Sequence, residues 1–308
     1  MAGKGGVGKT VVSATLARAA ARAGLSTLVI EVEGKSGLPT MFGQPPLDYD
    51  EVVLGAGGGP AGEGEVRART LTPDDALLDY LRDHGLSRIS KRLVSSGAID
   101  VVATAAPGIK DILILGKVKQ LERLGDADLL VLDAPAAGHA ITFLQAARAL
   151  LDTVRVGPIN AQAKDVLEML TDHTRCRVVL VTLPEETPVN ELVDTAFNLE
   201  DRVGVGLGPV VVNGLYDDIV GVRTAPAEAA TAAGVDLSAA DADALGQAAA
   251  FRNDRMRLQQ EQLTRLADRL PLPQIRLPFV FTTEIGPAEL DALADRLLRE
   301  LEALPEPV

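Results

Sequence analysis

Short apolar runs recur along the chain and predict the strands of a sheet. Each run is rich in β-branched residues and almost continuously apolar, which is typical of strands covered on both faces, as in a parallel sheet. Stretches with helical periodicity lie between them, such as the Ala-rich segment from Thr10 to Ala23, which ends at Gly24. This alternation predicts a doubly wound α/β fold with a mostly parallel sheet. The runs are residues 26–32, 99–105, 127–134, 177–183, 208–215 and 274–281.

One part of the chain departs from the alternation of strands and helices. Residues 55–65 are rich in glycine and acids and predict a loop, and most of 73–125 has helical character. We therefore expect a single domain over residues 1–308, with a helical insertion at about 44–125 that returns to the sheet at 99–105.

A long helix is predicted towards the end of the chain, over residues 238–270. Ser238 stands at its start and Asp241 follows three residues later, which resembles the capping box of a helix N-terminus. The chain has no internal repeat.

The first ten residues contain the pattern of a phosphate-binding loop. Residues 3–10 read GKGGVGKT, which fits G-x-x-x-x-G-K-[ST]. In such a loop the backbone N–H groups surround phosphate oxygens, and the following helix offers its positive N-terminus. Lys9 would neutralise the β and γ phosphates, and the Thr10 hydroxyl would ligate Mg²⁺. The residues expected to bind the nucleotide here are Gly3, Gly5, Gly6, Val7, Gly8, Lys9 and Thr10.

An acidic residue ends the strand predicted at 127–134. Asp133 at such a position can hold the Mg²⁺ shell, as the corresponding acid does in phosphate-loop ATPases. Thr10 and Asp133 are therefore the predicted metal ligands, ATP and Mg²⁺ are the predicted cofactors, and the fold is expected to have P-loop NTPase topology.

Little of the chain precedes the loop. Phosphate-binding loops follow a buried strand, whereas only Met1 and Ala2 stand before Gly3. A sheet without that strand would leave unpaired edges on both neighbours. We expect the native protein to carry roughly ten further residues before Met1, enough for one strand.

Composition and charge narrow the classes of function. The chain has 43 acidic and 30 basic residues, for a net charge of -13, which argues against binding nucleic acid or an anionic membrane surface. Cys176 is the only cysteine, so one chain cannot form a thiolate metal site or hold an iron–sulfur cluster. There is no apolar run of 18 residues, the length that a membrane span needs, and we expect no secretory leader. We expect a cytoplasmic protein that reaches the membrane only through a partner.

The loop contains a second lysine that phosphate binding does not require. The string KGGVGKT, which begins at Lys4, resembles the deviant loop of a class of dimeric nucleotide-switch ATPases. In that class the lysine reaches across the dimer to the partner's nucleotide, where it acts like an arginine finger on the transferring phosphoryl group. The resemblance implies a homodimer, or a heterodimer with a related ATPase subunit. It also implies a catalytic role for Lys4 beside Lys9 and Asp133.

Further segments resemble the arsenical-pump and tail-anchored-protein targeting ATPases, in order along nearly the whole chain. LLVLDAPAAGHAITFL at 129–144 resembles their second switch, in which an acid, a proline and Gly-His lead into an apolar helix. This implies a switch role for His139, while a surface-loop histidine is the alternative. APGIKD at 106–111 and VTLPEETPVNEL at 181–192 resemble two more of their segments. The chain is identified as a member of this family, from an anion-transporting branch of actinobacterial type.

Two further segments resemble the part of the family that binds the nucleotide base. VVVNGL at 210–215 resembles the strand whose asparagine reads adenine, and LPFVFTTEIG at 277–286 resembles the loop that closes over the base. The resemblance implies that Asn213, whose amide can pair with the adenine edge, and Pro278 contact the base. The alternative for Asn213 is a structural asparagine in a strand-end turn.

The chain departs from the family at the first switch. The family has an aspartate that positions the attacking water, and Glu33 stands at that place in the segment EVEGKSGLPTMFG. A glutamate can accept a proton from water but is one methylene longer, and a displacement of about 1 Å can cost on the order of 10²-fold in rate. Glu33 is the predicted base, with Glu31 as the competing choice.

The lone cysteine also excludes two functions found in the family. The arsenite-pump members bind metalloid through three cysteines, and the eukaryotic targeting members join their dimer through a CxxC zinc site. Neither cysteine set is present here, so we expect no arsenite and no cysteine-based zinc site.

The leading hypothesis is an ATPase that couples Mg²⁺–ATP hydrolysis, through a dimer, to a membrane-protein or transport partner. The helical insertion would handle that partner or a hydrophobic cargo, although the chain has only four methionines for an adaptable groove. The alternative is a regulatory subunit that binds ATP, hydrolyses it weakly and pairs with a related active ATPase, which Glu33 favours. A chromosome-partition ATPase would need a basic surface for DNA, which the charge does not favour.

Overall fold

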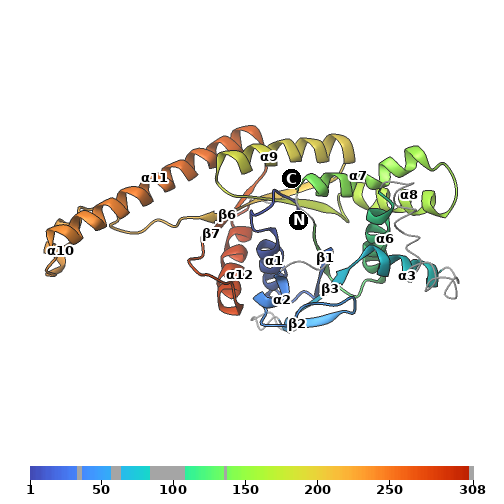
Figure 1. The fold of residues 1–308 in the computed structure, drawn as a ribbon, viewed down its shortest axis with the longest axis horizontal. Helices are drawn as coiled ribbons and strands as arrows, with labels where there is room; N and C mark the ends of the chain where they lie inside the picture. The colour runs from blue at the N-terminus through green and yellow to red at the C-terminus, as the bar shows by residue number, and fades with distance from the viewer. Residues whose placement is uncertain (33–36, 57–63, 84–107, 135–136, 305–308) are drawn as a thin grey trace.

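The structure of the chain is a computed structural model. The structure describes residues 1–32, 37–56, 64–134 without 84–107, and 137–304. Helices and strands alternate along most of this length (Figure 1). The strands are β1 (Thr27–Val32), β2 (Val52–Ala56), β3 (Glu65–Leu71), β4 (Leu129–Asp133), β5 (Arg177–Thr182), β6 (Gly206–Leu215) and β7 (Gln274–Pro278). The helices are α1 (Lys9–Arg22), α2 (Leu38–Met41), α3 (Pro73–Asp83), α6 (Ile109–Leu124), α7 (Ala137–Thr153), α8 (Pro158–Thr171), α9 (Glu186–Asn198), η1 (Leu199–Val203), α10 (Pro226–Ala233), α11 (Ala239–Arg269) and α12 (Pro287–Glu302).

The described strands form two groups. One has the order β2-β3-β1-β4 and the other β5-β6-β7. The pairings β1–β3, β1–β4, β5–β6 and β6–β7 are parallel, and β2 alone among the described strands runs antiparallel to its neighbour. The predicted doubly wound, mostly parallel α/β fold is therefore confirmed.

Met1 and Ala2 join the two groups of strands. The amine of Met1 donates to the carbonyl of Leu132 on β4 at 2.7 Å. On the other side, the N–H of Ala2 donates to the carbonyl of Val179 at 3.0 Å, and the N–H of Val181 donates back to Ala2 at 2.8 Å. Next to this link, a cavity of about 370 Å³ lies between β4 and β5 and is lined mainly by apolar side chains. The phosphate-loop segment therefore starts from the middle of the sheet.

Helices cover both faces of the sheet because successive strand residues point to opposite sides. On β1, Leu28 and Ile30 belong to a core shared with α6, α7, α8 and α9, whereas Val29 belongs to a core shared with α1 and α12. These side chains are 3% exposed or less, so β1 is buried on both faces as its apolar sequence predicted.

Most predicted elements agree with the structure to within a few residues. α1 covers the helix predicted from Thr10 to Ala23, and α11 covers the helix predicted at 238–270. The side chain of Ser238 accepts a hydrogen bond from the N–H of Asp241 at 3.1 Å, so the predicted N-terminal cap is confirmed. The predicted strand at 99–105 lies outside the described residues.

Two strands lie where the sequence analysis predicted only a helical insertion and a loop. β2 and β3 both fall inside residues 44–125, and β3 pairs with β1 inside the sheet, so that part of the prediction was wrong. The reason lies in two arginines that interrupt the apolar pattern of β3. Arg67 forms an ion pair with Glu51 at 2.5 Å, and the guanidinium of Arg69 lies 4.4 Å from the centre of the Tyr49 ring. On β3, Val66 and Ala68 alternate with these arginines and face the core, and the arginine contacts let the other face of the strand carry charged side chains inside the sheet.

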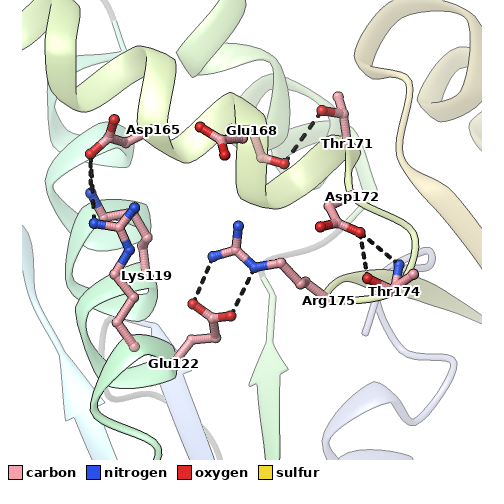
Figure 2. Close-up of polar contacts among 9 residues, drawn as sticks. Lys119, Glu122, Asp165, Glu168, Thr171, Asp172, Thr174 and Arg175 are labelled. Carbon is pink, nitrogen blue, oxygen red and sulfur yellow. Dashed lines mark hydrogen bonds and ion pairs between the residues drawn. The ribbon is translucent and has the colours of Figure 1, made fainter.

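Ion pairs connect α6 to α8 and to the chain that enters β5 (Figure 2). Lys119 on α6 binds Asp165 on α8 at 2.6 Å, and Glu122 accepts two hydrogen bonds from the guanidinium of Arg175 at 2.9 and 2.8 Å. The paired guanidinium lowers the pKa of the Glu122 carboxyl. A bidentate pair of this kind fixes orientation, so α6 and the chain entering β5 are held together.

One helical hairpin extends away from the rest of the molecule. α10 and the first half of α11 project from the body in Figure 1, and the buried residues of α11 all lie in its second half. They are Gln259, Leu263 and Leu266. Within the described residues, no helix combines the length and apolarity needed to cross a membrane.

Candidate functional site

The loop between Ala2 and α1 has the backbone that its glycines predict. Gly6 and Gly8 have φ values of 85° and 88°, in the left-handed region that favours glycine. Gly3 and Gly8 also allow close approach. A Cβ at Gly3 would lie 2.2 Å from the carbonyl oxygen of Val181, and one at Gly8 would lie 2.3 Å from the amide nitrogen of Asn213. The loop therefore packs closely against both β5 and its neighbour β6.

Lys9 is the first residue of α1 and extends back over this loop. Its ammonium donates to the backbone carbonyl of Lys4 at 3.2 Å. Burial lowers the pKa of Lys9, and the attraction of Asp133 opposes that shift. A cation held over a loop of N–H groups at a helix N-terminus forms a site for a polyanion.

The predicted metal ligands lie side by side although they are 123 residues apart in the sequence. The hydroxyl of Thr10 donates to one carboxylate oxygen of Asp133 at 2.6 Å. Asp133 ends β4 and is 8% exposed, and its other oxygen accepts a hydrogen bond from Ser13 at 3.0 Å. Oxygen atoms of this kind are the ligands that Mg²⁺ prefers, so the donor set fits the ion.

The sequence analysis did not identify Ser13 as part of the site. It stands three residues after Thr10 on the same helix, and this spacing places both hydroxyls on one face. The three-residue spacing was the sequence signal that could have pointed to Ser13. It becomes informative only when the acid that faces both hydroxyls is known.

Glu31 is a second acid next to this arrangement. It lies opposite Asp133 in the pairing of β1 with β4 and is 3% exposed. One of its oxygens accepts a hydrogen bond from Thr70 at 3.2 Å, and the other has no hydrogen-bond partner among the described residues. Burial raises the pKa of Glu31 to about 7. Glu33, the predicted base, lies outside the described residues.

The second lysine of the loop binds a residue of its own chain. The ammonium of Lys4 forms an ion pair with Glu191 on α9 at 2.7 Å, and both side chains are more than one-third exposed. Exposed pairs of this kind contribute little to stability, about 0–1 kcal/mol. The contact therefore holds Lys4 only weakly.

The residues predicted to contact the base lie on the opposite side of the loop from Asp133. Asn213 on β6 donates its side-chain amide to the carbonyl of Val7 at 3.1 Å. Pro278, the last residue of β7, is in register with Leu215, two residues beyond Asn213. The backbone of His139 lies in the first turn of α7, and its side chain is not among the described parts.

These features define a class of protein. Residues 1–304 match the family described as the CobQ/CobB/MinD/ParA nucleotide binding domain. The chain belongs to this family, and its loop, Lys9 and Asp133 occupy one continuous site at the carboxyl edge of the sheet.

Individual relatives narrow the class to the ATPases that the sequence resembles. ATPase BagA from Mycobacterium tuberculosis is 33% identical over 68% of this chain, and the match covers 63% of that relative. An arsenical pump-driving ATPase from Escherichia coli is 25% identical over 69% of this chain and 38% of the relative. An ATPase ASNA1 homolog from Paramecium tetraurelia is 27% identical over 46% of this chain and 41% of the relative. The predicted membership of the arsenical-pump ATPase family is confirmed, and the chain spans less than two thirds of these relatives.

Proposed function

We propose that this protein binds Mg²⁺–ATP and works as a nucleotide-switch ATPase. The hydrogen bond from Thr10 to Asp133 carries the proposal, because it brings a hydroxyl and a carboxylate together directly behind the phosphate-binding loop. The loop N–H groups and Lys9 would bind the phosphates, and Thr10 and Asp133 would hold the ion. When bound, Mg²⁺ offsets the negative charge of the phosphates.

Hydrolysis is proposed to need two chains. Lys4 lies on the exposed side of the loop, where its weak pair with Glu191 is open to replacement. A cation supplied by a second subunit would stabilise the phosphoryl group in transfer, and the partner is either a second copy or a related ATPase subunit. Glu33 is proposed as the group that positions water.

The process that ATP hydrolysis would drive is proposed by analogy with the relatives. The name of the Escherichia coli relative states that it drives an arsenical pump. By analogy we propose that the switch acts on a membrane-protein or transport partner, while the single cysteine argues against arsenite as the species bound.

The direct test is a Lys9→Ala variant in calorimetry with Mg²⁺–ATP. We expect its affinity to fall by up to about 100-fold, because a hydrogen bond to a charged group contributes about 1.5–3 kcal/mol. Lys164→Ala, a change of the same kind on α8, is the control and should bind like the wild type. Tight ATP binding by Lys9→Ala contradicts the proposed function.

A further inference from the structure

The projecting hairpin leaves an apolar stripe of α11 exposed in the single chain. Ala244, Phe251 and Leu258 recur every seven residues, so their side chains lie on one face of the helix. Phe251 is 66% exposed and Leu258 is 44% exposed, whereas Phe143 in the core is 2% exposed. The first half of α11 also stands clear of the body (Figure 1). The stripe is therefore apolar surface that one chain does not bury.

α10 packs on a different face of α11 and does not cover this stripe. Leu245 and Ala249 of α11 line a groove together with Ala229 and Ala230 of α10. At 3.6 residues per turn, Ala249 lies nearly opposite Phe251 around the helix axis. The face that carries Phe251 is therefore open to a partner from outside the hairpin.

Charges are divided unevenly along the same segment. Residues 226–251, the outer part of the hairpin, contain four acidic residues and no lysine or arginine. Residues 252–269, the inner part of α11, contain five arginines and three acids. The four acids of the outer part form no ion pair within the part of the chain that the structure describes. The outer part of one hairpin is therefore complementary in charge to the inner part of another.

The spacing of these charges has a two-fold pattern. Asp241 and Asp243 precede Arg255 and Arg257 by 14 residues, about 21 Å along a helix, and the alanines 248–250 lie midway. When two copies of α11 cross antiparallel at these alanines, the acids of each copy come opposite the arginines of the other, at both ends of the contact. Small side chains at the crossing allow the two helices to approach closely.

The arginines have only weak partners in the single chain. Arg255 lies 3.3 Å from Glu185, and Arg257 lies 2.8 Å from Glu261 and 3.6 Å from Asp254. All five side chains are more than one-third exposed. Exposed pairs contribute little to stability, so a contact with a second chain can replace them.

The hairpin leaves the body beside the surface that exposes Lys4. α9 carries Glu191, the partner of Lys4, and the same helix contacts α11 through an ion pair of Glu186 with Arg265 at 3.3 Å. Figure 1 shows the two helices side by side. A second chain within reach of Lys4 would therefore also lie close to α11.

We infer that two copies of this chain pair through their hairpins, with the α11 helices antiparallel around residues 248–250. The stripe of Ala244, Phe251 and Leu258 forms the apolar centre of the contact, and the charges at its ends fix the register. The inference rests on the proposed two-chain function for the side on which the partner lies, and it identifies that partner as a second copy.

The first test is analytical ultracentrifugation of the full chain without nucleotide, over a range of concentrations. We expect a dimer that Phe251→Glu weakens by at least about 10-fold, because the substitution places a charge at the apolar centre. Circular dichroism and thermal unfolding of this variant should match the wild type, since Phe251 is exposed in the single chain. Asp268→Arg is the control, because Asp268 is exposed on the same helix but lies far from the crossing.

The second test exchanges the charges between two variants. One carries Asp241→Arg with Asp243→Arg, and the other carries Arg255→Asp with Arg257→Asp. Each alone brings like charges together and should dimerise at least about 10-fold more weakly than the wild type. Their mixture should form a heterodimer about as stable as the wild-type dimer, because every acid again meets an arginine.

Each other outcome has a distinct meaning. A wild type that stays monomeric at every concentration overturns the contact and leaves the stripe to a related subunit or a hydrophobic cargo. A dimer that withstands Phe251→Glu, or a mixture that gives no heterodimer, overturns it as well, since the chains then pair elsewhere. None of these results affects ATP binding, which calorimetry measures separately. A wild type that dimerises as expected but binds no Mg²⁺–ATP contradicts the proposed function and supports the contact.

Discussion

At the scale of single residues, the site combines groups whose chemistry depends on burial. Asp133 is buried but accepts two hydroxyl hydrogen bonds, which satisfy its charge. Glu31, its neighbour on β1, receives one hydrogen bond and leaves an oxygen unpaired among the described residues. Water solvates a carboxylate better than this environment does, so Glu31 favours its protonated form.

The Glu31 pKa leads to a prediction for stability against pH. The pKa is about 7 in the folded protein and 4.5 for the ordinary side chain, so between these values the folded state keeps a proton that the unfolded state loses. Stability should therefore fall as pH rises through this window, by up to about 1.4 kcal/mol per pH unit. Urea unfolding at several pH values would measure the slope, and Glu31→Gln should flatten it. A slope that is the same in both proteins would contradict the shift.

At the scale of elements, the phosphate-binding loop depends on two different properties of glycine. Gly6 and Gly8 both have a left-handed backbone, but only Gly8 faces another side chain at close range. An added Cβ at Gly6 meets no atom within 4 Å, and one at Gly8 meets the amide of Asn213 at 2.3 Å. Alanine substitutions at these two positions therefore distinguish the cost of backbone strain alone from the cost of strain together with steric overlap.

We predict that Gly8→Ala destabilises the protein more than Gly6→Ala. Gly6→Ala should cost about 1–2 kcal/mol, the usual price of a left-handed alanine, and Gly8→Ala should cost more because Asn213 must also move. Chemical denaturation of both variants measures the difference. In an Asn213→Ala background the excess should disappear, and an excess that persists there would place the conflict elsewhere.

At the scale of the whole molecule, the feature that needs a second chain is Lys4. In the single chain it is bound to Glu191, outside the group formed by Lys9, Thr10 and Asp133. The proposed dimer would exchange this weak contact for one with the partner's nucleotide.

We predict that two inactive variants restore activity when mixed. Lys4→Ala should bind ATP but not turn it over, and Lys9→Ala should bind no ATP but still offer its Lys4 to a partner. In an equal mixture, half of the dimers would be mixed and each would have one complete site, so ATPase activity should reach about one quarter of the wild type. Turnover by Lys4→Ala alone, or none in the mixture after subunit exchange, would contradict a lysine acting in trans.

Local patterns determined a large part of this protein in advance. Short stretches of neighbouring residues predicted the phosphate-binding loop, the helix after it, most strands and the Ser238 cap. Such local signals can be read directly from the sequence. The resemblance to the arsenical-pump ATPases predicted the family and proposed Asn213 and Pro278 as base contacts, because the segments that contain them follow the same order as in that family.

Only the tertiary structure decided which distant residues meet. It placed Asp133 against Thr10 and Ser13, put Glu31 opposite Asp133 and moved β3 into the sheet beside β1. It also placed Tyr216, which follows β6, against Phe279 and Phe281, which follow β7. The physical reason is that strand pairing and side-chain burial join segments far apart in the chain. A local window of sequence records what each segment prefers but not the segment against which it packs.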